Sequence, residues 1–250
     1  MLKQSEILSL HRIIPPGQLV HNPEWDRIEA YIPTSYPTNH ASYLTELQNG
    51  DLLCVWFAGS DEGAADIRIV MSRLKKNSNT WTKPEEISNE SGKAEQNPSL
   101  FQTPKGELWL IHTAMETRGC TLQEWQQKVQ SGKQSGAFAM QHTSVIRRRI
   151  SYDGGITWEQ GETLFDTPGS FCRQPIQILS NGRWIIGNWR SIDEHLAFGS
   201  DSSVFQLSDD QGASWKTVHV PASRGRVHGN VVELASGRLL AFFRSRSADY

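Results

Sequence analysis

The 250-residue sequence has few cysteines, no long apolar run and almost no net charge. Its three cysteines, Cys54, Cys120 and Cys172, are widely spaced and odd in number, which argues against a disulfide framework or a zinc site. The formal net charge of −2 gives no reason to expect nucleic acid or an anionic membrane as a partner. No run of about 18 apolar residues marks a membrane span, and the N-terminus lacks the pattern of a secretory signal. We therefore expect a soluble protein that is cytoplasmic by default.

Two short segments nearly repeat one another. "SYDGGITW" (151–158) and "SDDQGASW" (208–215) both read Ser-x-Asp-x-Gly-x-Thr/Ser-Trp, and "SRLKKNSNTW" (72–81) is a degraded copy without the Asp. Repetition over tens of residues indicates a stacked or radial architecture. Asp and Gly at these offsets predict a tight turn whose carboxylate accepts hydrogen bonds from backbone N–H groups. The Trp is expected to pack between neighbouring sheets.

Short β-type runs joined by tight turns make up most of the remaining chain. Hairpin signals stand at Asn49-Gly50, Lys105-Gly106, Asn181-Gly182 and Ser236-Gly237. Each of the first three hairpins is followed by a third apolar or alternating run, a copy of the repeat and a short outer strand. This order is typical of a four-stranded propeller blade. The expected fold class is therefore all-β, a β-propeller built of four-stranded antiparallel blades.

The sequence predicts an N-terminal segment (1–37), serving as a closing strand or as rim loops, and an incomplete propeller over 38–250. Blades are expected at about 38–90, 95–165, 170–220 and, in part, 226–250. Three and a half blades leave apolar faces and strand edges unpaired. We expect the missing blades to come from the rest of a longer chain or from self-association.

An insertion over 115–141 interrupts the second blade. Within it, Thr121 followed by Glu124 predicts a capping box at the start of a short helix that ends at Gly132. The insertion is expected to form a lid or wall beside the substrate, or a plain surface excursion.

Polar side chains are expected to meet at one rim of the propeller. In each blade the first strand runs toward the hairpin and the second runs back, so the start of one and the end of the other lie together near the axis. Arg suits the capture of a carboxylate, His exchanges protons near neutral pH, and a carboxylate offers a general acid or base. We predict catalytic roles for Asp66, Asp61, His40 and His228, and substrate-binding roles for Arg173, Arg244, Arg246, Arg190, Asn97 and His112.

An acidic glycan is the expected substrate at this mouth. No set of ligand residues has a spacing diagnostic of a metal site, so no metal and no cofactor are expected.

The repeats, with "NHASYLTELQNGDLLCVWFAGSDEGAADIRIVMSR", "QNPSLF" and "GRVHGNVVELASGRLLAFFRSRSADY", resemble the sialidase (neuraminidase) superfamily of BNR/Asp-box propellers from about Tyr31 onward. The resemblance implies six blades when complete and an exo-acting glycoside hydrolase. In that family three arginines grip the sialic acid carboxylate, an Asp is the acid/base and a Tyr assisted by a Glu is the nucleophile. By this resemblance Asp66, or Asp61, occupies the acid/base loop, and Arg173 with Arg244 or Arg246 are candidate carboxylate ligands.

Two departures from the family pattern leave other functions open. Tyr31 stands where the family has its first arginine, and the nucleophile would fall in later blades. A polysaccharide lyase acting next to a uronate would use Arg to neutralise the carboxylate and His40 or His228 to remove the α-proton. A non-catalytic propeller that binds glycans or proteins is the third possibility.

Overall fold

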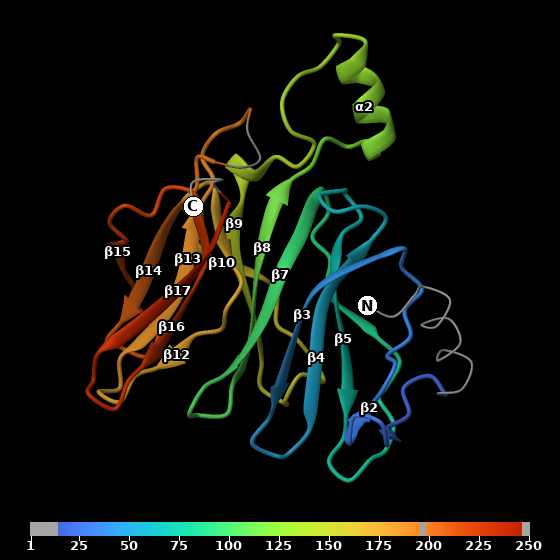
Figure 1. Cartoon of the computed structure of the whole chain (residues 1–250), viewed down its shortest axis with the longest axis vertical. Coiled ribbons are helices and arrows are strands. Elements are labelled where there is room, and N and C mark those ends of the chain that lie inside the picture. The colour runs from blue at the N-terminus through green and yellow to red at the C-terminus, as the bar shows by residue number, and fades with distance from the viewer. Residues whose placement is uncertain (1–14, 196–198, 247–250) are drawn as a thin grey trace.

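Antiparallel sheets stand side by side in the computed structural model, which describes residues 15–195 and 199–246 (Figure 1). Blade one consists of β3 (Thr38–Glu46), β4 (Leu52–Gly59), β5 (Arg68–Leu74) and β6 (Glu85–Ser88). Blade two consists of β7 (Lys93–Gln102), β8 (Leu108–Glu116), β9 (Val145–Ser151) and β10 (Glu162–Phe165). In both blades each strand pairs antiparallel with the next strand in the chain. The predicted all-β fold class, with propeller-type blades, is confirmed.

The third and fourth sheets differ from this pattern. Blade three consists of β11 (Ser170–Cys172), β12 (Gln177–Ile178), β13 (Trp184–Arg190), β14 (Ser202–Ser208) and β15 (Lys216–His219). It has five strands where four were predicted, because its inner strand is broken between β11 and β12. Pro175 lies in the break and has no N–H to donate. Blade four is the hairpin of β16 (Arg226–Glu233) and β17 (Leu239–Ser245).

The segment before blade one also forms β-structure. β1 (Val20–Asn22) and β2 (Arg27–Glu29) form a small hairpin. Just before it, the Leu19 amide donates to the Asn79 carbonyl at 2.8 Å, and the Trp81 amide donates to the Gly17 carbonyl at 2.8 Å. The N-terminal segment therefore runs along the loop between β5 and β6.

The four predicted hairpin turns are present and share one geometry. Their glycines all have φ between +77° and +93°, a region that favours residues without a Cβ. Each glycine amide donates to the carbonyl three residues earlier, at 2.8–2.9 Å. The turn residues are listed in chain order as Gly50, Gly106, Gly182 and Gly237.

The hydrophobic core lies in layers between the blades. Along β8, Leu108 and Leu110 pack in the layer shared with blade one, while Trp109 and Ile111 pack in the layer shared with blade three. Successive side chains of a strand point to opposite faces, so a strand between two sheets needs apolar residues on both. This explains why "LWLIHTAM" reads as a continuous apolar run rather than an alternating one.

The repeated Asp segments are built by hydrogen bonds within each turn. The Asp153 carboxylate accepts the amides of Ile156 and Thr157 at 3.0 and 2.9 Å, and the Gly155 amide donates to the Ser151 hydroxyl at 2.7 Å. The Thr157 hydroxyl also donates to Asp153, at 2.6 Å, and this bond, with those from the Thr157 amide and the Ser151 hydroxyl, holds the pKa of the Asp153 carboxyl well below its usual range. Asp210 makes equivalent bonds to Ser214, which lower its pKa to about 2.

The degraded copy in blade one obtains its carboxylate from elsewhere. Asp51, in the β3–β4 hairpin, accepts the Lys76 amide at 2.8 Å and the Arg73 guanidinium at 2.8 Å. Arg73 also donates to the carbonyl of Gly154, in the corresponding turn of blade two. Asp51 thus takes the place of the Asp that this copy lacks, and Arg73 joins the two turns.

The insertion in blade two contains the predicted helix, α2 (Leu122–Gln130), followed by the short 3₁₀ helix η1 (Gln141–Thr143). The capping box is confirmed: Glu124 donates its amide to the Thr121 hydroxyl, and its carboxylate accepts the Thr121 amide. The buried Trp125 lies beneath the Arg118 guanidinium, 4.3 Å from the ring centroid. Within the described residues, α2 is too short and too polar to cross a membrane, as is every other helix.

Candidate functional site: the axial mouth

The strand register places the two inner strands of each blade as the sequence predicted. At one rim, the start of β3 pairs with the end of β4 (Thr38 with Gly59), and the start of β7 pairs with the end of β8 (Lys93 with Glu116). In blades three and four, Ser170 pairs with Arg190 and Arg226 with Ser245. This is the upper rim in Figure 1, from which α2 projects. We call it the axial mouth.

A β-bulge recurs at the same depth below this rim. Two residues of the inner strand face a single residue of its partner at Ala41–Ser42 in β3, Asn97–Pro98 in β7 and His228–Gly229 in β16. The first residue of each pair has a left-handed backbone, with φ of +54°, +54° and +57°. In blade three the break that begins at Arg173 occupies the equivalent place.

The bulges are missed by sequence reasoning because none of the three left-handed residues is glycine. Counting nine residues back from the hairpin glycines of blades one, two and four finds them: Ala41, Asn97 and His228. The same count in blade three gives Arg173, where the strand break begins. His40, which the sequence analysis assigned to the site, is ten residues before Gly50 and so lies one position earlier than its counterparts. Bulges redirect the side chains of a strand, and left-handed non-glycine residues concentrate at functional sites. Their recurrence near the axis singles out this level of the propeller.

Three of the predicted arginines gather around His228. Burial is the main cause that lowers the pKa of the His228 imidazole, and the positive charges of Arg244, Arg246 and Arg173 lower it further, to about 4. His228 is therefore neutral at pH 7. Arg173 extends from blade three to blade one, where its Nη2 donates to the Ser42 carbonyl at 3.1 Å.

An aromatic stack supports this group. Trp189, only 1% exposed, stacks on Phe171 with ring centroids 5.2 Å apart and contacts His228 at 4.6 Å. The Arg246 guanidinium lies 5.9 Å from the Trp189 ring. Arg246 also pairs with the fully buried Asp201 at 3.1 Å. The rings hold His228 in place, and Asp201 fixes Arg246. The sequence had offered no reason to single out Asp201.

The rim loop between β4 and β5 carries the predicted acidic residues. Both Asp66 oxygens accept hydrogen bonds from Ser60, one from its hydroxyl at 2.7 Å and one from its amide at 3.1 Å. The Asp61 carbonyl caps the turn by accepting the Ala64 amide at 3.0 Å. No hydrogen bond or ion pair among residues 15–195 and 199–246 joins Asp61 or Asp66 to the three arginines. Burial lowers the pKa of Arg246, and the negative charge of Glu62 is among the effects that partly oppose this.

The remaining predicted site residues are dispersed. His40 is exposed and lies edge-on to Phe57, with ring centroids 5.3 Å apart. Asn97 accepts the weak Cys172 thiol bond at 3.8 Å through its backbone carbonyl. Arg190 follows Trp189 in β13 and so projects from the opposite face of the sheet.

His112 does not lie at the mouth, contrary to the sequence prediction. It sits inside β8, opposite the Asn97 bulge, and its side chain is 0% exposed. Burial lowers the pKa of its imidazole to about 3. A side chain enclosed in this way has no surface to offer a glycan, so we withdraw His112 from the substrate-binding set.

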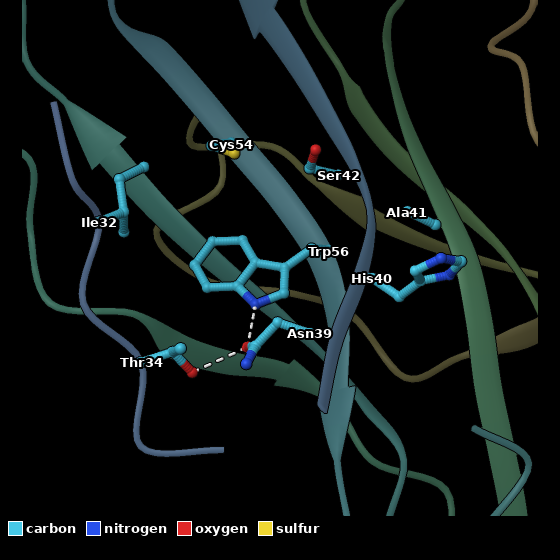
Figure 2. A pocket seen from close by; sticks show the side chains of 8 residues that line it. All are labelled: Ile32, Thr34, Asn39, His40, Ala41, Ser42, Cys54 and Trp56. Atoms are coloured by element: carbon cyan, nitrogen blue, oxygen red, sulfur yellow. Dashed lines mark hydrogen bonds between the residues drawn. The ribbon is translucent and has the colours of Figure 1, made fainter. Parts of the chain in front are cut away.

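A second hollow lies on the face of blade one that points away from blade two (Figure 2). Its wall is organised by Asn39, whose Oδ1 accepts the Trp56 indole N–H at 2.9 Å and the Thr34 hydroxyl at 2.8 Å. His40 lies on the other side of β3 from Trp56 in this view. None of the lining residues is Arg, Lys, Asp or Glu, so this hollow suits an acidic ligand less well than the mouth does.

The repeated turns, the four-stranded sheets and the shared mouth define a propeller of the BNR type. A family model described as "BNR repeat-like domain" matches residues 50–250. The chain belongs to this family. No curated protein matches it.

Several solved structures with similar folds are sialidases, and another, from Dyadobacter fermentans, is a protein of unknown function with a TM-score of 0.62 at 18% identity, over 84% of this chain and 63% of its own. A Hadza microbial sialidase has a TM-score of 0.62 at 16% identity, over 83% of this chain and 42% of its own. The NanB sialidase of Streptococcus pneumoniae has a TM-score of 0.61 at 14% identity, over 98% and 52%. The intramolecular trans-sialidase of Ruminococcus gnavus has a TM-score of 0.61 at 12% identity, over 85% and 67%. This chain thus spans about half the length of the first two sialidases, and identities this low show the fold alone.

Proposed function

We propose that the axial mouth binds an acidic sugar and that the whole protein acts on it as an exo-glycosidase of the sialidase type. The supporting observation is the gathering of Arg173, Arg244 and Arg246 around one neutral His228. Asp201 already pairs with Arg246, but within the described residues no ion pair joins Arg173 or Arg244 to a carboxylate. A guanidinium binds a carboxylate through two parallel hydrogen bonds. A sugar carboxylate is the ligand that such a group fits.

In hydrolysis the arginines orient the sugar through its carboxylate, and an acid protonates the departing glycosidic oxygen. We assign this proton transfer to the β4–β5 rim loop, with Asp66 as the first candidate and Asp61 as the second. The short bonds from Ser60 fix the Asp66 carboxylate in one orientation. The nucleophile is not assigned to any residue of this chain.

Elimination from a uronate is the second candidate, and His228 favours it. A base that removes the proton next to a carboxylate must be neutral before it reacts, and the pKa of about 4 keeps His228 neutral at pH 7. The surrounding guanidiniums would stabilise the negative charge that develops on the carboxylate. The proton that His228 takes from the sugar is balanced by a proton donated to the leaving glycosidic oxygen, so elimination breaks the glycosidic bond without a water or an enzyme nucleophile. A binding role without catalysis is the third outcome.

Product mass distinguishes these candidates. The protein is incubated with a panel of sialosides and uronate-containing oligosaccharides, and the products are weighed by mass spectrometry. Products that together exceed the substrate by one water indicate hydrolysis. Products that sum to the substrate, one of them unsaturated, indicate elimination. Substrate that stays intact but binds saturably indicates a glycan-binding role without catalysis. If the protein neither cleaves nor binds any member of the panel, the proposal is refuted.

The arginine group is tested by two charge-removing substitutions. Arg244→Gln removes a guanidinium at the mouth, while Arg238→Gln removes one from the β16–β17 hairpin at the opposite rim. We expect the first to weaken binding of an acidic sugar by roughly tenfold or more, since charge-assisted hydrogen bonds contribute about 1.5–3 kcal/mol. The second should leave binding unchanged. If the two substitutions weakened binding equally, the assignment of the binding site to the axial mouth would be wrong.

A further inference from the structure

A second polar cluster lies between blades one and two. Glu95 on β7 and His112 on β8 face the layer shared with blade one, and Glu90 comes from the connection between β6 and β7. One ligand atom from each of these three side chains lies within 4.8 Å of the other two. The Ser88 hydroxyl, at the end of β6, donates to Glu95 Oε1 at 2.6 Å. Both blades thus contribute to the cluster.

The interior of this cluster is unsatisfied. Glu95 and His112 have side chains that are 0% exposed, yet Glu95 Oε2 and both ring nitrogens of His112 have no hydrogen-bond partner. Leaving a polar atom buried without a partner costs about 1–3 kcal/mol, so buried polar atoms are normally paired. The two ring nitrogens point in diverging directions, and it is Nε2 that faces Glu95. Its lack of a partner, together with that of Glu95 Oε2, indicates that something else occupies the space between the two side chains.

The separation of the two side chains identifies what fits. His112 Nε2 and Glu95 Oε1 are 3.7 Å apart, too far for a direct hydrogen bond. Two atoms that bind one ion at about 2.0–2.2 Å, with a ligand angle near 110–125°, lie about 3.4–3.8 Å apart. The pair is spaced as two ligands of one cation.

We propose that Glu90, Glu95 and His112 bind a divalent transition-metal ion, with zinc as the first candidate. Imidazole and carboxylate ligands together suit zinc and its neighbours better than calcium or magnesium, which take oxygen ligands. Three protein ligands leave a fourth position for water. Glu90 retains partial exposure, at 27% of its side chain, and so provides the path by which the ion enters.

Two positively charged side chains border the cluster and limit its affinity. Arg147 donates its Nε to Glu90 Oε1 at 2.7 Å, which leaves the other carboxylate oxygen of Glu90 for the ion. Arg149 donates instead to backbone carbonyls, among them Glu159 at 2.8 Å. Bound in the cluster, the ion would join the segment leaving blade one to the inner strands of blade two.

The test uses metal-stripped protein titrated with zinc chloride by calorimetry, together with its melting temperature. We expect one equivalent of zinc to bind and the melting temperature to rise by about 5–10 °C at a zinc concentration about 100 times the Kd. Cobalt(II) should give visible absorption bands of a site with a nitrogen ligand.

Matched substitutions assign the ligands. Glu95→Gln has the same shape and keeps an acceptor for Ser88, and Glu90→Gln changes only a partly exposed side chain. Each should weaken zinc binding at least tenfold. His219→Asn, at an exposed position of β15, controls for zinc captured by surface histidines and should change nothing.

Three results would overturn the proposal: no zinc binding by the unaltered protein, binding unchanged in both glutamine variants, or binding lost equally in the His219→Asn control. If Glu95→Gln does not fold, Glu90→Gln and the cobalt spectrum still decide, because neither alters the buried pair. A cluster that holds only a water molecule would give neither the calorimetric signal nor the cobalt bands.

Discussion

Gly212 offers a sharp test of how blades two and three pack. It has φ of +86°, and a Cβ added there would lie 2.7 Å from Cη2 of Trp109 and 3.1 Å from Cζ3 of Trp184. Both indoles are buried, at 4% and 2% exposure, and they contact each other edge to face with centroids 5.5 Å apart. Neither ring can withdraw without disturbing the layer between the blades. Gly212→Ala should therefore destabilise the protein for two separate reasons.

The two contributions can be separated by a control. Forcing an alanine into a left-handed backbone costs about 1–2 kcal/mol, and overpacking a core costs typically about 1–3 kcal/mol. Gly182 has nearly the same φ, +84°, but nothing within 4 Å of its added Cβ. Gly182→Ala should thus cost only the first amount, and Gly212→Ala about 2–5 kcal/mol. The difference of about 1–3 kcal/mol measures the contact with the two indoles.

Urea denaturation gives both free energies of unfolding, provided that the slope against urea concentration is the same in the two variants. At the size of this protein each kcal/mol should also lower the melting temperature by about 2–4 °C. Equal losses in the two variants, within about 0.5 kcal/mol, would refute the reasoning. In that case the indoles would have room to move, and the turn would not pin blade three against blade two.

Three further predictions concern protonation and helix capping. The pKa of His228 is about 4 in the folded protein but about 6.5 in an unfolded chain, so the unfolded state takes up protons first and stability falls as the pH drops from about 6.5 to 4. His228→Gln should reduce the slope of that part of the stability profile, the remaining slope coming from His112, and His219→Gln should not; identical profiles would contradict the assigned environment. The hydrogen bonds from Ser214 lower the pKa of Asp210 to about 2, so their stabilisation is present above about pH 4 and is lost as the pH falls through 2. Urea midpoints measured from pH 2 to 6 should show this acid loss diminished in Asp210→Asn, and an unchanged loss would count against it. Thr121→Ala removes the cap of α2 and should cost about 1 kcal/mol locally; hydrogen exchange within α2 should quicken about fivefold, and unaltered exchange would show that the cap does not hold the helix.

Features that depend only on residues close together in the chain could be predicted from the sequence. The turn at Asn49-Gly50 needs a left-handed residue, and the glycine supplies it whatever surrounds it. The capping box at Thr121 and the bonds of Asp153 to Ile156 and Thr157 also form within four residues. Because these contacts close short loops, their residue types and spacing are sufficient to identify them. Repetition of such units then predicts the propeller.

The candidate site was predicted only in outline. The topology of alternating strands brings the beginnings and ends of inner strands to one rim, where Arg173, Arg244 and His228 lie near one another; their roles in binding and catalysis stay predictions. It could not place His112, because whether a strand residue faces solvent or a neighbouring blade depends on what packs against it. It also missed Asp201, whose pairing with Arg246 spans 45 residues.

The sequence by itself determined the turns, the strands and the repeat, because these rest on local backbone preferences and on the period of apolar residues. Tertiary structure alone decided which distant side chains meet. It places the Asp51 carboxylate in a turn that lacks its own, and it brings Arg173 to the carbonyl of Ser42, 131 residues earlier. It also buries Glu95 beside His112. No spacing in the chain encodes these contacts, since they follow from the packing of whole sheets against one another. The chemistry proposed for both sites depends on them.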